Sequence, residues 1–214
     1  MKFDEFQSIT ERFAQTPIPG EDAHAQVFPD IAKFRKEALR KNPTPRLSAV
    51  GAIFLPVHSE THLLLIERQS YDGVHSGQIG FPGGKIEKED NDLEETARRE
   101  TEEEVGVNRD TLQRLGHLSE VYIPPSGFLV KPYIFQLTEM PQLVPDPREV
   151  RSILTLPISR LLMPEVFEEG IVSAGNGTKI KTKYIMHEDK KIWGATAMML
   201  SELKVLLHQI THAK

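Results

Sequence analysis

Residues 83–107 constrain the fold of this 214-residue chain more than any other segment. The segment opens with two glycines, which favour a tight turn, and continues into a run rich in helix-forming Glu and Arg over 92–105. Asn91 or Asp92 can cap the start of this helix, and Gly106 suits its carboxy-terminal end. The sequence therefore predicts a well-bounded helix directly after a glycine turn.

The acids of this helix do not all point the same way. At about 100° per residue, Glu100 and Glu104 lie within about 20° of Leu93 on the side that faces the core, and Glu103 lies about 80° to the other side. Carboxylates turned towards the protein are costly unless something pairs with them, and acids at this spacing repel one another. A solvated acidic face is the alternative. The inward angle favours a divalent cation, Mg²⁺ or Mn²⁺, which takes oxygen ligands and binds phosphates.

The composition excludes several classes of protein. With 39% hydrophobic and 27% charged residues, the chain fits one elaborated globular domain. A net charge of -5 argues against a protein that binds nucleic acid, and no apolar run reaches the roughly 20 residues that cross a membrane. The chain has no cysteine, and its first residues do not resemble a leader, so we expect a cytoplasmic protein.

The chain divides by pattern into a helical extension, 1–45, and a main domain, 46–214. The extension predicts one helix near its start and a second over 30–41, and we interpret both as packing or dimer-contact elements. The apolar residues of the first helix motivate the hypothesis of a homodimer. Three phenylalanines recur there at helical spacing: Phe3, Phe6 and Phe13.

After residue 46 the pattern changes to β-like runs, with the acidic helix in the middle and another helix at the end. The first two runs predict a hairpin, and the order of elements indicates a mixed, layered α/β fold. The expected strands are 47–57, 62–67, 118–122, 128–137 and 178–186, with a loop at 73–84, a turn at 175–177 and a closing helix at 195–208.

The spacing of the acidic segment resembles a known family motif. It is similar to the Nudix box, whose general form has Glu at the position of Asp90 and one residue fewer before Arg99. The Asp and the extra residue resemble the coenzyme A pyrophosphatase branch of that superfamily. The matching pattern is Gly84-x5-Asp90-x8-Arg99-Glu100-x2-Glu103-Glu104-x-Gly106-Val107.

An upstream signature of the same branch is matched in part. The chain departs from it at Ile66, Gln69 and Gly73, and the missing basic side chain at Gly73 removes a cation that could hold an anionic nucleotide. With further similar segments included, the resemblance covers roughly residues 46–200. The signature residues present are Leu64, Leu65, Arg68, Gly77, Phe81, Pro82, Gly83 and Gly84, and the further similarity lies in 122–128, 149–150, 156–157 and 193–197.

The resemblance implies an α/β/α sandwich with a mixed sheet and a metal-dependent hydrolase that binds a small nucleotide. The implied substrate is coenzyme A or an acyl-coenzyme A, cleaved to adenosine 3',5'-bisphosphate and 4'-phosphopantetheine. The alternatives are a Nudix hydrolase of ADP-ribose or a nucleotide sugar, and a Nudix-like binding module without catalysis. The intact Glu100, Glu103 and Glu104 weigh against the binding module.

The resemblance also implies roles for the acids. Glu100, Glu103 and Glu104 would hold Mg²⁺ or Mn²⁺, which would orient the diphosphate and lower the pKa of an attacking water. Either Glu103 in the helix or Glu149 in a later loop would accept the proton of that water.

Neighbouring residues would complete the site. Arg99 would orient the acids by pairing with Asp90 or a neighbouring Glu. Arg68 would either contact phosphate or close an ion pair at a strand end. Gly83 and Gly84 would bring the loop backbone close to the metal site, or would only permit the turn.

Overall fold

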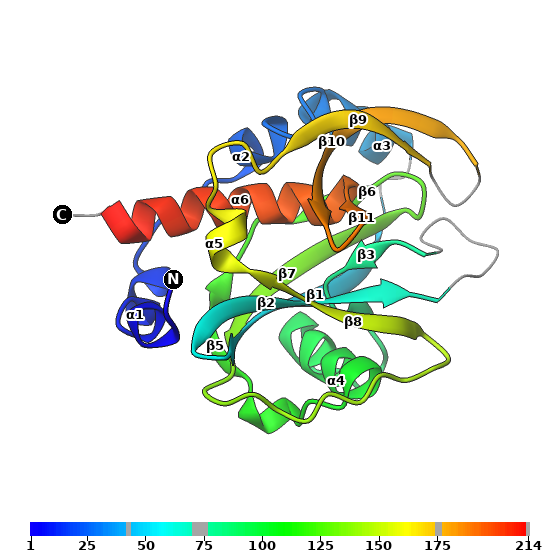
Figure 1. Ribbon diagram of the computed structural model, residues 1–214. Helices are drawn as coiled ribbons and strands as arrows, with labels where there is room; N and C mark the ends of the chain where they lie inside the picture. The colour runs from blue at the N-terminus through cyan, green and yellow to red at the C-terminus, as the bar shows by residue number, and fades with distance from the viewer. Residues whose placement is uncertain (42–43, 70–76, 174–176, 213–214) are drawn as a thin grey trace.

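The computed structural model describes most of the chain (Figure 1). Gly73, one of the departures from the branch signature, lies outside the described residues, and so does the expected turn except for Gly177. Among the described residues, no helix is long and apolar enough to cross a membrane. The described residues are 1–41, 44–69, 77–173 and 177–212.

The described part of the chain contains six α-helices and two short 3₁₀ helices. The expected helices at 30–41, 92–105 and 195–208 are confirmed, and α2 and α5 are helices that the sequence pattern did not predict. The helices are α1 (Phe3–Gln7), η1 (Thr10–Ala14), α2 (Glu21–Ala25), α3 (Ile31–Lys41), α4 (Leu93–Val105), η2 (Arg109–Thr111), α5 (Ile158–Leu161) and α6 (Gly194–His212).

The strands differ more from expectation. The expected strand at 118–122 is only partly confirmed, because β5 ends at His117 and β6 begins at Val121, and two short strands, β3 and β4, overlap the expected loop at 73–84. The strands are β1 (Arg46–Val57), β2 (Glu60–Arg68), β3 (Ile79–Gly80), β4 (Gly83–Lys85), β5 (Gln113–His117), β6 (Val121–Ile123), β7 (Phe128–Gln136), β8 (Val150–Pro157), β9 (Glu168–Ser173), β10 (Lys179–His187) and β11 (Lys190–Ile192).

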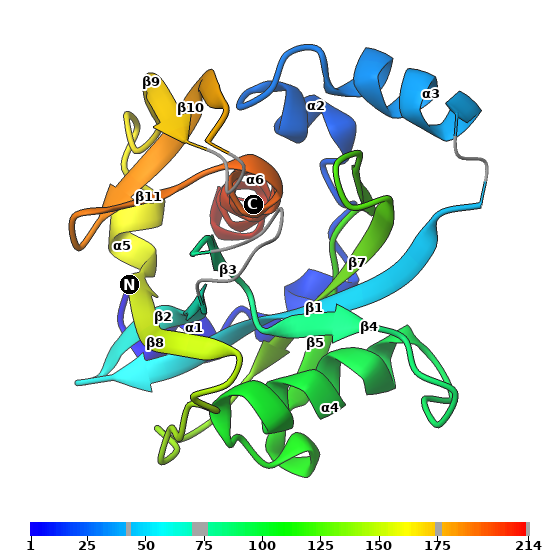
Figure 2. The same ribbon diagram turned by 90° about the vertical axis from the view of Figure 1, so that its right-hand side faces the viewer.

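Strands β1 to β8 form one mixed sheet within the described residues. Its main path runs β3-β2-β1-β7-β5, with β4 on β1, β6 on β7 and β8 on β2. The β1–β7 pair is parallel and the other pairs are antiparallel. Helix α4 covers one face and α6 covers the other (Figures 1 and 2). This arrangement confirms the expected α/β/α sandwich.

Strand β1 supplies both cores because successive side chains point to opposite faces of the sheet. Ala52 and Phe54 belong to the larger core, which also contains residues of α6 and the amino-terminal segment. Ile53 and Leu55 belong to the smaller core under α4. The β1–β4 pairing places Gly83 and Gly84 at the edge of this layer, next to α4.

The first predicted helix is divided into α1 and η1. Phe6 and Phe13 lie on the same ring, Phe54, with ring centroids 4.4 and 5.8 Å away. Seven residues of straight helix would separate Phe6 and Phe13 by about 10 Å along the axis, so the chain must turn between them. All three phenylalanines, Phe3 included, are buried in the core of this chain. The sequence-based reason for a homodimer is therefore wrong, and the dimer itself stays a prediction.

Candidate functional site

The structure fixes both ends of α4. Asp92, one of the two expected caps, accepts a hydrogen bond from the backbone N–H of Glu95 at 2.8 Å. Gly106 ends the helix with φ +73°, a left-handed conformation that favours glycine. A cap at each end holds the acidic side chains in between at a fixed rotation about the helix axis.

The loop before β8 is tied to the last turn of α4. The backbone carbonyls of Glu104 and Val105 accept hydrogen bonds from the N–H groups of Asp146 and Val144, at 3.0 and 2.9 Å. These carbonyls have no partner within the helix itself. The loop therefore satisfies the helix end and, three residues after Asp146, brings Glu149 beside the helix.

Glu104 is the buried acid of the site, with 1% of its surface exposed. Its carboxylate accepts hydrogen bonds from the N–H of Gly83 at 2.7 Å and from Nη1 of Arg68 at 3.1 Å. Burial raises the pKa of Glu104 to about 7, since the charge of Arg68 and the Gly83 hydrogen bond offset only part of the lost hydration. Nearby Glu100 and Glu149 raise this pKa further.

Glu100 lies one turn before Glu104 and is half-buried. Burial raises the pKa of Glu100 above its usual value, although the positive charge of Arg99 opposes the change. Nη1 of Arg99 donates to Glu100 at 3.0 Å. The inward orientation that the sequence predicted for Glu100 and Glu104 is therefore confirmed, and both carboxylates carry the electrostatic cost of burial.

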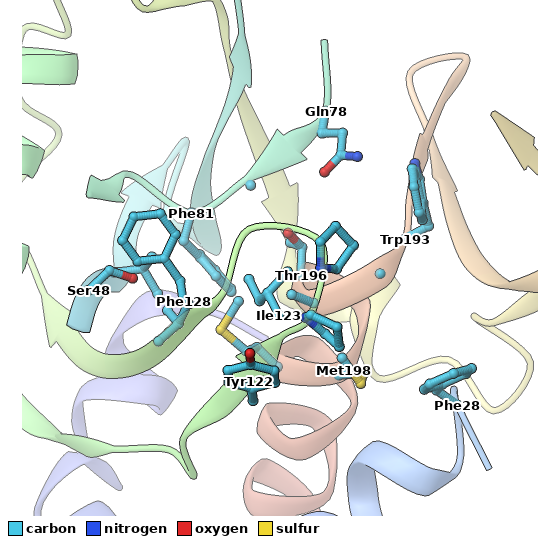
Figure 3. Close-up of a pocket in the computed structure, with 18 of the residues that line it drawn as sticks. Phe28, Ser48, Gln78, Phe81, Tyr122, Ile123, Phe128, Trp193, Thr196 and Met198 are labelled. Atoms are coloured by element: carbon cyan, nitrogen blue, oxygen red, sulfur yellow. The ribbon is translucent and has the colours of Figure 1, made fainter. Parts of the chain in front are cut away.

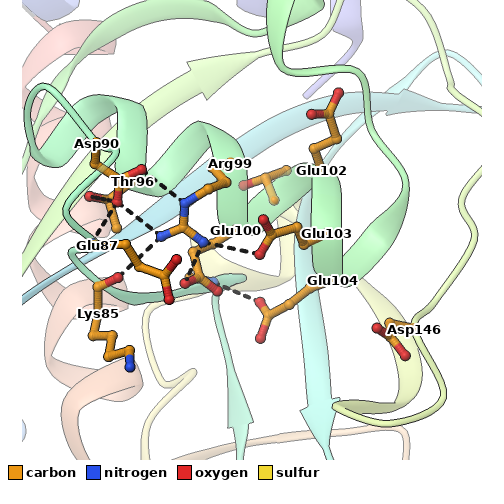
Figure 4. A network of polar contacts seen from close by, with 12 residues as sticks. Lys85, Glu87, Asp90, Thr96, Arg99, Glu100, Glu102, Glu103, Glu104 and Asp146 are labelled. Carbon is orange, nitrogen blue, oxygen red and sulfur yellow. Dashed lines mark hydrogen bonds and ion pairs between the residues drawn. The ribbon is translucent and has the colours of Figure 1, made fainter.

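Arg99 joins the acids to the glycine turn (Figure 4). It donates to both carboxylate oxygens of Asp90 at 2.9 Å, to Glu103 at 3.0 Å and to the backbone carbonyl of Lys85 at 3.2 Å. Its hydrogen bonds hold the pKa of Asp90 well below the usual range, despite burial. The sequence predicted that Arg99 pairs with Asp90 or with a neighbouring Glu. Arg99 pairs with both kinds of partner, because its guanidinium has enough donors for Asp90, Glu100 and Glu103.

The carboxylates that lie closest together are not the predicted set of three. Among the described residues, one oxygen each from Glu100, Glu104 and Glu149 lie within 4.8 Å of one another. Glu103 is outside this cluster, and its side chain is 55% exposed and paired with Arg99. The sequence named Glu149 only as a proton acceptor, because nothing in its local pattern reveals how near the loop comes to α4.

Glu100 and Glu104 fit a hard divalent cation, with Glu149 beside them. Oxygens across an octahedral Mg²⁺ are about 4 Å apart, so small side-chain rotations would bring Glu100 and Glu104 to ligand distances, and the exposed Glu149 lies close enough to reach an oxygen bound to the cation. The donor set is all oxygen, which such cations prefer. Burial raises the pKa of Glu104, and a bound cation would oppose this by stabilising the ionised carboxylate.

The two glycines serve the site in different ways. A Cβ on Gly83, whose φ is +150°, would lie 2.3 Å from the backbone oxygen of Ala49. A Cβ on Gly84 would lie 2.3 Å from Oε1 of Glu100. Gly83 is therefore required by the backbone of the sheet, whereas Gly84 leaves space for the carboxylate of Glu100.

We expect Gly84→Ala to lower activity and Gly83→Ala to lower stability. Gly84→Ala should lower kcat/KM roughly tenfold to a hundredfold, because it displaces the Glu100 carboxylate, with little change in Tm. Gly83→Ala should lower Tm, because its Cβ meets backbone rather than a movable side chain. Gly116→Ala is the control, since its Cβ would meet its nearest atom at 3.8 Å. Equal activity of Gly84→Ala and wild type would contradict this role of Gly84.

A cavity of about 740 Å³ lies beside the acids (Figure 3). Arg68, Gly83 and Gly84 line it, and the same three residues contact the carboxylates of α4. Nη2 of Arg68 also donates to the carbonyl oxygen of Gly83 at 2.7 Å, so its guanidinium is held between the cavity and Glu104. An anion in the cavity would therefore meet Arg68 and the acid cluster together.

The far side of the cavity comes from residues that the sequence did not assign to a site. Phe28, Ile31 and Phe34 of the amino-terminal segment line it together with Ile180 of β10 and Met198 of α6. Ile31 and Phe34 lie on α3, which the sequence predicted as a helix over 30–41, but the local pattern could not show what this part of the helix meets. The interpretation of this helix as a packing or dimer-contact element stays a prediction, and the structure adds that the helix forms a wall of the cavity.

Comparison with known proteins agrees with this arrangement. The NUDIX domain family model matches residues 45–170. A Photorhabdus laumondii protein named as an uncharacterized Nudix hydrolase, NudL, is 32% identical over 155 residues, which cover 72% of this chain and 82% of that protein. Nudix hydrolase 3 of Caenorhabditis elegans is 25% identical over 213 residues, covering 88% of this chain and 86% of that protein.

A solved structure supports the fold. A MutT/nudix family protein from Enterococcus faecalis superposes with a TM-score of 0.51 over 92% of this chain and 77% of that chain, at 14% identity. The family model spans more than half of the chain, and its match includes the glycine turn, helix α4 and Glu149. The chain therefore belongs to the Nudix family and is a Nudix hydrolase.

Proposed function

We propose that this hydrolase, with Mg²⁺ or Mn²⁺, cleaves the diphosphate of coenzyme A or an acyl-coenzyme A. The products would be adenosine 3',5'-bisphosphate and 4'-phosphopantetheine or its acyl form. The observation that carries the proposal is the position of Arg68, which lines the apolar cavity and contacts Glu104 of the acid cluster. A substrate with a diphosphate at one end and a long, weakly polar arm suits such a site.

The acids divide into ligands and a proton acceptor. Glu100 and Glu104 form the centre of the proposed metal site, and Glu103, oriented by the same Arg99 guanidinium as Glu100, supplies a further carboxylate. A divalent cation bound there would neutralise the diphosphate and activate water. Glu149 accepts the proton, because it lies within reach of the cluster and no cation pairs with it in the described part of the chain.

Arg68 and Arg99 have separate tasks in this proposal. Arg68 faces the cavity and binds a phosphate oxygen of the substrate, for which its planar fork of donors is suited. Arg99 is a positioning residue, because its contacts with Asp90, Glu100 and Glu103 hold acids rather than reaching the cavity. The backbone N–H of Gly83 keeps Glu104 aimed at the metal site.

Product analysis tests the proposed reaction. The protein is incubated with Mg²⁺ or Mn²⁺ and, separately, coenzyme A, dodecanoyl-coenzyme A and ADP-ribose, and the products are identified by mass spectrometry. Cleavage of either coenzyme A compound to adenosine 3',5'-bisphosphate supports the proposal. Cleavage of ADP-ribose alone would keep the hydrolase and reject this substrate. A ligand-dependent rise in Tm without turnover would instead favour a binding module.

If Glu149 accepts the proton and Glu103 helps to bind the metal, substitutions at the two positions should have different effects. Glu149→Gln should lower kcat about a hundredfold or more, while Mn²⁺ affinity stays close to that of wild type. Glu103→Gln should weaken Mn²⁺ binding and raise the metal concentration needed for half-maximal rate. Metal titration by calorimetry and initial rates measure both effects. The reverse pattern would exchange the two roles.

A further inference from the structure

The cavity has a charged side and an apolar side. Among its described lining residues, Arg68 and Lys85 are the charged ones, and both come from the strands next to the acid cluster. Ser48 pairs with Lys85 in the sheet, and Figure 3 shows Phe28 on the opposite side of the cavity from Ser48. The cavity therefore extends from the site of the diphosphate towards the amino-terminal helices.

The amino-terminal wall is held in place by a buried polar junction. Glu202 of α6 is fully buried and accepts hydrogen bonds from His24 at 2.8 Å, the N–H of Gly20 at 3.0 Å and the hydroxyl of Ser119 at 2.7 Å. Ser201 donates to the carbonyl of Ala23 at 2.8 Å. Helix α2 is thus fixed on α6, and the chain that follows it has a defined start beside the cavity.

The wall presents apolar surface that the chain does not cover. Phe34 is 47% exposed, although it lines the cavity, and its ring lies 5.1 Å from that of Phe28 between centroids. Ile180 of β10 is 37% exposed and lines the same cavity. An apolar group placed there would remove this surface from water, which favours binding.

We propose that Phe28, Ile31 and Phe34 bind the acyl chain of an acyl-coenzyme A and thereby determine its preferred length. The inference rests on the proposed function, and it assigns the thioester arm of the substrate to the cavity. The adenosine half carries an additional 3'-phosphate, which needs a cation, and the wall offers none among its described lining residues. The acyl chain needs only apolar surface, so the arm and the wall match.

The wall predicts a change in chain-length preference. Phe34→Asp places a carboxylate beside the acyl chain, so the ratio of kcat/KM for dodecanoyl-coenzyme A to that for coenzyme A should fall roughly tenfold, since each methylene that loses apolar surroundings costs about fourfold in binding. Met163→Asp is the matched control, because Met163 is also 47% exposed and does not line the cavity. It should leave the ratio unchanged.

A binding measurement separates this inference from the reaction. S-dodecanoylpantetheine has no diphosphate, so its binding to the wild-type protein in EDTA, measured by calorimetry below its micelle concentration, reports on the cavity alone. We expect it to bind at least tenfold tighter than S-acetylpantetheine, and Phe34→Asp to remove most of the difference. Equal affinity of the two thioesters, or equal effects of Phe34→Asp and Met163→Asp, would overturn the acyl wall. Chain-length-dependent binding without cleavage of any coenzyme A compound would keep the wall and reject the proposed reaction.

Discussion

Replacing Glu104 by Gln should lower kcat by roughly a hundredfold to a thousandfold without unfolding the protein. Gln has nearly the same shape but no charge, so it removes a central carboxylate of the proposed metal site. Metal titration and initial rates measure the loss. Glu102→Gln is the matched control, since Glu102 is on the same helix and points away from the acid cluster (Figure 4). It pairs with the half-buried Arg109 instead.

The same variant should become relatively more stable as the pH rises. The folded-state pKa of Glu104, about 7, exceeds its usual value of 4.5, so the folded protein holds this proton more tightly than the unfolded chain does. Wild type therefore loses stability from about pH 5 to pH 8, whereas the amide of the Glu104→Gln variant does not titrate. At pH 8 the contribution approaches about 3 kcal/mol as an upper bound.

Thermal unfolding in EDTA at pH 5, 6.5 and 8 measures this effect. The difference in Tm should shift in favour of Glu104→Gln as the pH rises, and added Mn²⁺ should stabilise wild type more than the variant. A pH-independent difference in Tm would mean that Glu104 is ionised at no cost. Full activity of Glu104→Gln would show that Glu104 is not a metal ligand.

Local patterns predicted the parts of the site that lie close together in the chain. The helix over 92–105 has its own capping residues and helix-forming composition, so its angles alone placed Glu100 and Glu104 towards the core. The pairing of Arg99 with Asp90 also followed from the motif. These features depend on positions within about ten residues of one another, for which helical geometry is a sufficient guide.

The parts that the sequence did not predict depend on distant pairings. Strand β8 pairs with β2, far earlier in the chain, and this pairing brings Glu149 to the acid cluster. Strands β3 and β4 are short and contain glycine, so their strand character comes from β2 and β1 rather than from local propensity. The position of Phe34 in the cavity wall likewise depends on the junction at Glu202, which no periodicity reveals.

The second large effect concerns Asp90, which supports the site without reaching the cavity. Its side chain is 2% exposed and that of Arg99 is 11% exposed. Besides Arg99, Asp90 accepts hydrogen bonds from the N–H of Glu87 and the hydroxyl of Thr96, both at 2.9 Å. Removing one partner of a buried ion pair costs about 3 to 5 kcal/mol, and we expect the lower end here because Glu100 and Glu103 still pair with Arg99.

Asp90→Asn should therefore lower Tm by about 10 °C near neutral pH, since 1 kcal/mol corresponds to roughly 2 to 4 °C in a protein of this size. The pKa of Asp90 is held well below its usual range, so its contribution to stability is complete above about pH 4 and is lost as the pH falls towards the folded-state pKa. The difference in free energy of unfolding between wild type and Asp90→Asn should be constant from pH 5 to pH 8 and shrink below pH 4. Glu169→Gln provides the surface control, because Glu169 pairs with Lys181, both side chains are more than half exposed, and the loss of this pair should leave Tm unchanged. Equal small effects of the two variants would show that the Asp90–Arg99 pair does not stabilise the site.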